Sequence, residues 1–241
     1  MAEKKRRTIA LLIVLMLSLG ATLLSDLKSR QEPADQVAGT NVVEQQPKTQ
    51  KASEALEELE VKGRAPKTGY SRSEFGQGWA QLDACDVRNY VLKRDLTSVQ
   101  TRSDTDCTVI SGILNDPYTG KQQAFIRGPD TSDDVQIDHV VALSDAWQKG
   151  AQNLEKERRV QFANDGLNLL AFNGTANNQK SDSDAASWLP PDKAYRCMYV
   201  ARQIAVKQKY VLWVTAAEKD AMGRVLASCP DQQLPYVGTV L

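Results

Sequence analysis

The sequence predicts a mixed α and β domain that begins near residue 67 and follows an N-terminal leader and a linker. Short apolar runs at 107–114 and 123–127 flank the turn-forming stretch 115–120, which is typical of a β-hairpin. Longer segments carry apolar residues at helical spacing, namely 83–97, 194–211 and 216–227. The chain of 241 residues is 41% hydrophobic and 25% charged, which is near the average of globular proteins and argues against wholesale disorder.

The middle of the domain adds a second pair of strands and two helices. Residues 135–143 predict a strand that leads into a helix near Ser144, and residues 167–172 predict a short strand that ends in a turn at 173–174. The helices are expected over 154–164 and 175–188, and the Pro190-Pro191 pair ends the second of them.

The first 25 residues predict an export signal. A positive cluster at residues 4–7 precedes a nearly unbroken apolar run of 16 residues from Ile9 to Leu24. This run is shorter than the ~20 residues that span a bilayer, which favours a cleaved signal peptide. No clean small-residue cleavage site follows it, which favours an uncleaved membrane anchor. Both alternatives place the rest of the chain outside the cytoplasm, either secreted or anchored by one transmembrane segment.

Residues 26–66 are rich in Gln, Glu, Lys, Pro and Ala and contain no aromatic residue, which predicts a flexible linker. Within it, Ser53 to Val61 is compatible with one short helix. All four cysteines lie beyond the linker, and an even number in an exported chain predicts two disulfides. Three pairings are possible, and we favour Cys85 with Cys107 and Cys197 with Cys229 because these are nearest in sequence.

The composition also excludes several kinds of site. His139 is the only histidine, so a zinc site or protease helix that needs two histidines is ruled out. No Cys-x-x-Cys pair is present, which argues against a four-cysteine zinc site. The formal net charge is zero, and from residue 66 onward 20 basic and 21 acidic side chains give −1. The domain therefore has no overall positive field that would attract nucleic acid.

Three short motifs carry the chemistry: Asp138-His139 at a strand end, Asn168 in the next strand, and Asn177-x-x-Lys180 in the following helix. With their flanking residues they resemble the HNH-type endonucleases of the ββα-metal group, in particular the nuclease domain of GmrSD-type modification-dependent restriction enzymes and its exported bacterial relatives. The segments that carry the resemblance are IDHVVALSDAW at 137–147, FANDGLNLLAFNGTANNQKSDSDAASWLPP at 162–191, CDVRNYVLKRDL at 85–96 and GILNDPYTGK at 112–121. The resemblance implies an α+β fold for residues 67–241, with a ββα-metal (HNH) nuclease core, additional helices and an upstream β-hairpin.

The resemblance also implies a role for each motif residue. His139 would be the general base, since an unperturbed imidazole pKa of ~6.5 leaves it largely neutral at physiological pH. Asp138 and Asn177 would supply oxygen ligands to one divalent metal, Mg²⁺ or Mn²⁺. Asn168 would orient His139 or hold the neighbouring loop, and Lys180 would contact a phosphate.

Two points of geometry stay open in the sequence. Asn177 and Asn178 are adjacent, so the identity of the helix ligand is uncertain by one position, although the spacing to Lys180 favours Asn177. Neighbouring residues of an ideal strand point to opposite faces, so Asp138 and His139 reach one site only where the strand distorts or ends. Asp182 and Asp184, in the second half of the helix expected over 175–188, are expected to face solvent.

The function that follows from the resemblance is an exported, metal-dependent endonuclease that hydrolyses phosphodiester bonds in DNA, with RNA left open as a substrate. Its partner would be nucleic acid, with membrane contact only through the N-terminal segment. The alternative is an inactive, disulfide-bonded nuclease-like domain that binds a surface partner. The charge of −1 supports the alternative, because phosphate binding depends on Lys and Arg that displace counterions.

Overall fold

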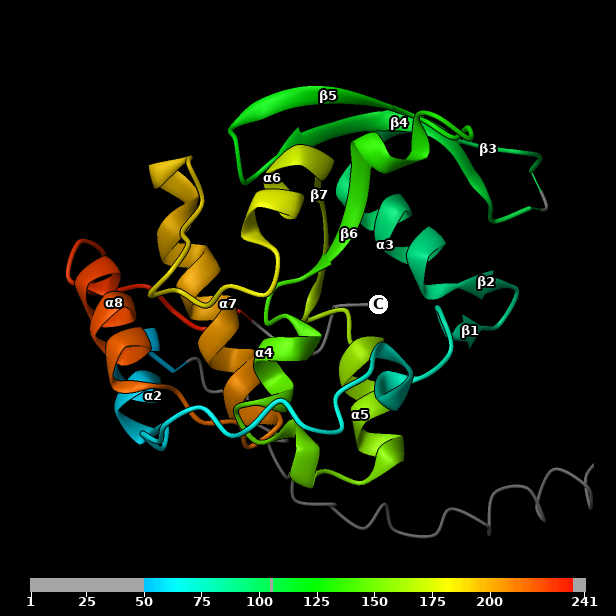
Figure 1. The fold of residues 1–241 in the computed structure, drawn as a ribbon. Helices are drawn as coiled ribbons and strands as arrows, with labels where there is room; N and C mark the ends of the chain where they lie inside the picture. The colour runs from blue at the N-terminus through cyan, green and yellow to red at the C-terminus, as the bar shows by residue number, and fades with distance from the viewer. Residues whose placement is uncertain (1–49, 105, 236–241) are drawn as a thin grey trace, which may run out of the picture. The chain divides into compact units, whose positions relative to one another are not determined.

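The computed structural model describes residues 50–104 and 106–235, which form an α+β arrangement of short sheets and helices (Figure 1). The helices are α2 (Ala52–Glu58), α3 (Val87–Asp95), α4 (Leu143–Trp147), α5 (Lys156–Ala163), α6 (Gly174–Lys180), α7 (Arg196–Lys209) and α8 (Ala216–Leu226), with short 3-10 turns η1 (Arg72–Phe75), η2 (Ser132–Asp134), η3 (Ala151–Asn153) and η4 (Lys193–Tyr195). The strands are β1 (Gln81–Leu82), β2 (Cys85–Asp86), β3 (Leu96–Thr101), β4 (Val109–Asp116), β5 (Lys121–Ile126), β6 (Val135–His139) and β7 (Leu169–Asn173).

The predicted hairpin is present as β4 and β5, and β3 adds a third antiparallel strand that the sequence did not single out. Burial alternates along the second half of β4, where Leu114 and Asp116 are buried while Ile113 and Asn115 are exposed. This is the pattern of a sheet with one covered face. The carboxylate of Asp116 accepts backbone N–H bonds at the start of the turn, and so fixes its entry.

A second, two-stranded antiparallel sheet and the helix after it follow the predicted order of strand, strand and helix. In this sheet β6 pairs with β7, with Val135 opposite Asn173 and His139 opposite Leu169. The side chain of Asn173 caps α6 by accepting a bond from the Ala176 N–H at 2.9 Å. The helix ends at Lys180, well short of the predicted residue 188. The chain leaves the helix there because Ser181 adopts a left-handed backbone with φ of 51°.

The linker prediction for 26–66 is wrong over its described part, because residues 50–66 belong to the folded domain. Helix α2 buries Ala52, Ala55 and Leu56 in one core cluster with residues of α7 and α8. The apolar residues of this short helix therefore have a partner surface, which the polar composition of the segment concealed. Residues 26–49, and the leader at 1–25, lie outside the described residues.

Both predicted disulfides are present. Cys85 of β2 pairs with Cys107 before β4, and Cys197 of α7 pairs with Cys229 after α8. The two bridges close loops of the folded domain and are typical of proteins in oxidising compartments. In the described part of the chain, no helix has the length and apolar character needed to span a membrane.

We expect Leu56→Ala to lower the free energy of unfolding by about 2–5 kcal/mol, because it leaves a cavity where a fully packed side chain was. The exposed Glu54 of the same helix supplies the control, and Glu54→Ala should change it by less than about 0.5 kcal/mol. Urea unfolding measures both. Equal stability of Leu56→Ala and wild type would show that residues 50–66 act as a linker.

Candidate functional site

The site lies where β6 ends. Asp138 and His139 are consecutive, and their side chains have different partners, as expected for neighbours on a strand. Both nevertheless line one polar cavity of about 570 Å³, which also receives Asn177 from α6. Neighbours on a regular strand point to opposite faces, but the strand stops at His139. Asp138 and His139 can therefore share a site.

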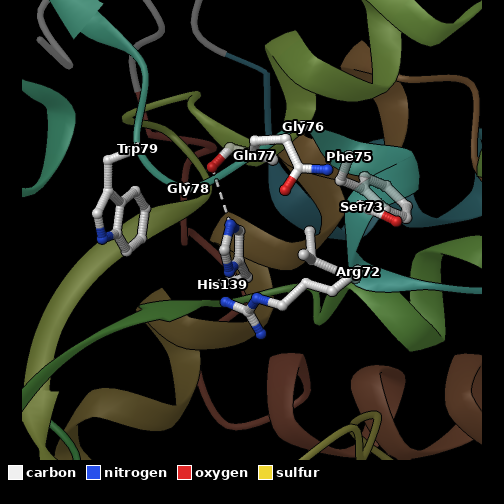
Figure 2. Close-up of a pocket in the computed structure, with 10 residues that line it drawn as sticks. Arg72, Ser73, Phe75, Gly76, Gln77, Gly78, Trp79 and His139 are labelled. Carbon is white, nitrogen blue, oxygen red and sulfur yellow. Dashed lines mark hydrogen bonds between the residues drawn. The ribbon is translucent and has the colours of Figure 1, made fainter.

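His139 is held in one tautomer by a backbone contact. Its Nε2 lies 2.8 Å from the carbonyl oxygen of Ala163 at the end of α5 (Figure 2). A carbonyl oxygen can only accept, so Nε2 carries the proton and donates it. The lone pair of the neutral ring is therefore on Nδ1. The Trp79 ring lies nearly parallel to the imidazole, with the ring centroids 5.9 Å apart, which restricts its orientation.

The surroundings of His139 favour the neutral ring. Burial lowers the pKa of His139 to about 3, although the bond to Ala163 opposes this shift. The positive charges of Arg72 and Lys180 lower the pKa further. At neutral pH, Nδ1 is thus available as a proton acceptor.

Two side chains, Tyr118 and Lys180, hold the carboxylate of Asp138. Its carboxylate accepts the hydroxyl of Tyr118 at 2.6 Å and forms an ion pair with Lys180 at 3.0 Å. Burial raises the pKa of Asp138, while the charge of Lys180 and the bond from Tyr118 counteract this rise. Tyr118 and Lys180 are themselves fully buried, so they fix the carboxylate rigidly from the protein side.

Lys180 occupies a different place from the predicted phosphate contact. Its ammonium donates to Asp138 Oδ1 at 3.0 Å and to the His139 carbonyl at 2.9 Å, and none of its surface is exposed. The side chain points inward because α6 packs directly against β6 and β7. In this arrangement Lys180 positions both members of the Asp138-His139 pair.

Asn168 holds the backbone that follows His139. Its side-chain oxygen accepts the Val141 N–H at 2.8 Å, and its amide donates to the Val141 carbonyl at 3.2 Å. Its own carbonyl accepts the Val140 N–H at 2.8 Å. The side chain contacts the loop rather than the imidazole, which is one of the two arrangements that the sequence allowed.

The cavity residues fit a hard cation that keeps most of its water. The amide nitrogen of Asn177 donates to Gln136 Oε1 at 2.9 Å, which leaves the Asn177 carbonyl oxygen as the acceptor. A carboxylate has about four lone-pair positions, so Asp138 retains room for a cation beside Tyr118 and Lys180. In the described ranges, no group of three or more His, Cys, Asp or Glu side chains is placed to hold a metal ion.

Residues 67–79 contribute side chains that the sequence analysis missed. Arg72 lines the polar cavity and also a smaller one of about 270 Å³, which Phe75, Trp79 and His139 share. Figure 2 shows this segment passing over His139. The only sequence signal is the run FGQGW at 75–79, where Gly76 and Gly78 have positive φ of 104° and 72°.

The domain also contains a buried charge network, and it corrects the prediction that Asp184 faces solvent. Asp184 is only 3% exposed, whereas the Asp182 side chain is about half exposed, as expected. Lys149 forms ion pairs of 2.6–2.7 Å with three carboxylates, those of Asp145, Asp184 and Glu218. Lys207 pairs with Glu218 at 3.0 Å, and Arg64 pairs with Asp184 at 2.7 Å.

Comparison with known proteins gives the family. The model of the family described as GmrSD restriction endonucleases, C-terminal domain, matches residues 86–225, which is more than half of the chain. The chain belongs to this family. This member of the GmrSD C-terminal domain family has the two disulfides and the candidate site described above.

A protein from Arthroderma benhamiae, described as an uncharacterized secreted protein, is similar to this member of the GmrSD C-terminal domain family. The two sequences are 38% identical over 185 residues, which cover 76% of this chain and 87% of the relative. No solved structure matches the chain significantly. The region matched by the family model begins at Asp86, so Arg72 and Trp79 lie outside it.

The neutral His139 predicts a dependence of stability on pH. In the unfolded chain an imidazole binds its proton near pH 6.5, whereas the folded chain resists protonation down to about 3. The stability of the fold should be complete above pH 6.5 and fall as the pH drops toward 3, by up to about 1.4 kcal/mol per pH unit. Urea unfolding in EDTA at pH 7, 6, 5 and 4 measures this slope.

The control for this slope is His139→Gln, which removes the only imidazole of the chain. The variant should lose the part of the slope between pH 6.5 and 4 that is due to histidine. Parallel curves for wild type and variant would contradict a buried, neutral His139.

The charge network predicts a large effect of one conservative change. Glu218→Gln keeps the shape of the side chain but removes a negative charge that pairs with two fully buried ammonium groups, those of Lys149 and Lys207. The free energy of unfolding should therefore fall by about 3–5 kcal/mol. Asp220→Asn changes an exposed carboxylate of the same helix, and should cost less than about 0.5 kcal/mol. Similar urea midpoints for the two variants would contradict a network on which the helices depend.

Proposed function

We propose that the protein is an exported endonuclease that hydrolyses phosphodiester bonds in DNA, with RNA left open as a substrate. The observation that carries the proposal is the neutral His139, with its Nδ1 lone pair available at a cavity that also contains Asp138 and Asn177. A general base, an oxygen donor set and a polar cavity for a phosphate are the parts that such a reaction needs. Membership of a family named for restriction endonucleases supports the same reading.

In the proposed reaction, His139 Nδ1 accepts a proton from a water molecule as its oxygen attacks the phosphorus. The bond from phosphorus to the 3′ oxygen breaks, and that oxygen takes a proton from solvent, which leaves a 5′-phosphate and a 3′-hydroxyl. The bond from Nε2 to Ala163 keeps the ring oriented and stabilises the imidazolium that forms. Lys180 and Tyr118 keep Asp138 in place throughout.

Asp138 and Asn177 are the residues that would hold a single divalent cation, Mg²⁺ or Mn²⁺, in this site. Such a cation supplies positive charge opposite the negative charge that develops on the phosphate and the leaving oxygen. Residues 66–241 carry a formal net charge of −1, so a bound cation would also offset part of the negative charge of this region.

The proposed location is outside the cytoplasm. The two disulfides fit an oxidising compartment, and the relative from Arthroderma benhamiae is described as secreted. The predicted leader lies outside the described residues, so secretion and anchoring both remain compatible with the proposal.

The test is cleavage of supercoiled plasmid by the oxidised full-length protein in Mg²⁺, Mn²⁺ or EDTA. We expect nicking that requires a divalent metal and that falls by about 100-fold or more in His139→Ala, because general base catalysis contributes ~10²–10⁴. A folded, metal-supplied protein that cleaves neither DNA nor RNA would contradict the proposal. That result would favour the alternative of an inactive domain that binds a surface partner.

Two neighbouring asparagines test the metal ligand. Asn177→Ala should require a higher Mg²⁺ concentration for half-maximal cleavage, because it removes one of two proposed protein ligands. Asn178→Ala is the matched control, since this side chain also lines the cavity but has no proposed ligand role, and its Mg²⁺ requirement should equal that of wild type. The reverse result would move the ligand by one position.

A further inference from the structure

Arg72 stands at the entrance to the proposed active site. It is the first residue of η1, its side chain is exposed, and it lines both the polar cavity and the smaller cavity over His139. Figure 2 shows its guanidinium beside the imidazole, on the side away from the bond to Ala163. This is the side that carries the Nδ1 lone pair.

The guanidinium of Arg72 forms no ion pair or hydrogen bond with any of the residues that the structure describes. Within residues 50–104 and 106–235, only Arg72 and Arg224 among the arginines form neither an ion pair nor a hydrogen bond. The other cations that line the polar cavity are engaged. Lys67 pairs with Asp182 at 3.2 Å, and Arg88 donates to the carbonyls of Ser132 and Val135. Arg72 is therefore the cation of this cavity with its donors available for a ligand.

The backbone that carries Arg72 is held firmly although its side chain is exposed. Phe75, in the same turn, is buried against Phe162 with the ring centroids 5.8 Å apart. Glu74 forms an ion pair with Arg159 of α5 at 3.0 Å, and the Glu74 carbonyl accepts a bond from the same arginine. These contacts fix η1 to α5, the helix whose last residue also binds His139. Arg72 and His139 are thus positioned by one common element.

A phosphate attacked by water at Nδ1 must lie close to that atom, because the water bridges the base and the phosphorus. A guanidinium on the same side of the ring would then face the non-bridging oxygens. Its planar fork of donors matches two phosphate oxygens at once, in a way that a lysine does not. Residues 66–241 carry a formal net charge of −1 and give no overall attraction for an anion, so a local cation at the site would help to hold an anionic substrate.

We propose that Arg72 binds the non-bridging oxygens of the scissile phosphate and stabilises the charge that develops on them during attack. The inference rests on the proposed function and deepens it, since it names the residue that recognises the reacting group. It also places a catalytic residue upstream of the region that defines the family, which begins at Asp86.

The test compares Arg72→Ala, Arg72→Lys and Arg224→Ala in the oxidised full-length protein with Mg²⁺. Arg224 is the matched control, because it is also exposed and unpaired but lines a different cavity on α8. We expect kcat to fall by about 100-fold in Arg72→Ala with a smaller change in KM, as for loss of one donor to a transition-state charge. Arg72→Lys should recover part of kcat, and Arg224→Ala should stay within about twofold of wild type.

A second measurement separates phosphate contact from a structural role. In a His139→Ala background, fluorescence anisotropy with a labelled DNA oligonucleotide gives the dependence of log Kd on log salt. Arg72→Ala should reduce this slope by about 1, the value for one lost phosphate contact, whereas Arg224→Ala should leave it unchanged. A change that only disturbed the fold would lower stability without a selective loss of slope.

The outcomes distinguish failure of the inference from failure of the proposed function. If wild type cleaves and Arg72→Ala cleaves within about twofold of it, or if Arg224→Ala loses as much activity, the inference is wrong and the proposed function stands. If wild type cleaves no nucleic acid, both are overturned. Retained cleavage with an unchanged salt slope in Arg72→Ala would equally exclude a phosphate contact.

Discussion

The fold depends on the buried charge network around Lys149. It joins three cations and three carboxylates from five separate parts of the chain: Arg64, Asp145, Lys149, Asp184, Lys207 and Glu218. A buried ammonium is costly when its partners are missing, so the network favours the arrangement in which α4, α7, α8 and the chain after α6 bring these carboxylates together. Arg64 extends it to the N-terminal segment. The network contributes positional specificity more than net stability, because desolvation of the ions offsets most of their attraction.

In the proposed site, too, a buried ion pair fixes the relative positions of separate elements. Asp138 and Lys180 form a buried pair, with Tyr118 as the third partner, and this pair connects β6, α6 and the turn after β4. The ammonium of Lys180 also binds the His139 carbonyl, so the position of the proposed base depends on the pair. Lys180, which the sequence suggested as a phosphate contact, thus holds Asp138 and His139 in place.

Residues 50–79, which precede the region matched by the family model, complete both the charge network and the proposed site. Residues 50–66 cover the core between α7 and α8, and residues 70–79 cover His139. These segments contribute one cation to the charge network, Arg64, and another to the cavity, Arg72. A domain limited to residues 86–225 would lack both cations. The segment is therefore part of the folded structure, although its polar composition predicts a linker.

The sequence by itself determined the strand, strand and helix order, both disulfides and the grouping of Asp138, His139 and Asn177. The strand order and the disulfides follow from local spacing and from order along the chain, whereas the grouping of the three side chains was implied by the resemblance to HNH-type endonucleases. Only the tertiary structure decided that Lys180 and Asp184 are buried, that residues 50–66 are folded, and that Arg72 reaches the cavity. The physical reason is that the burial of a charge depends on partners far away in sequence, and no local pattern records which distant carboxylate or carbonyl will meet it.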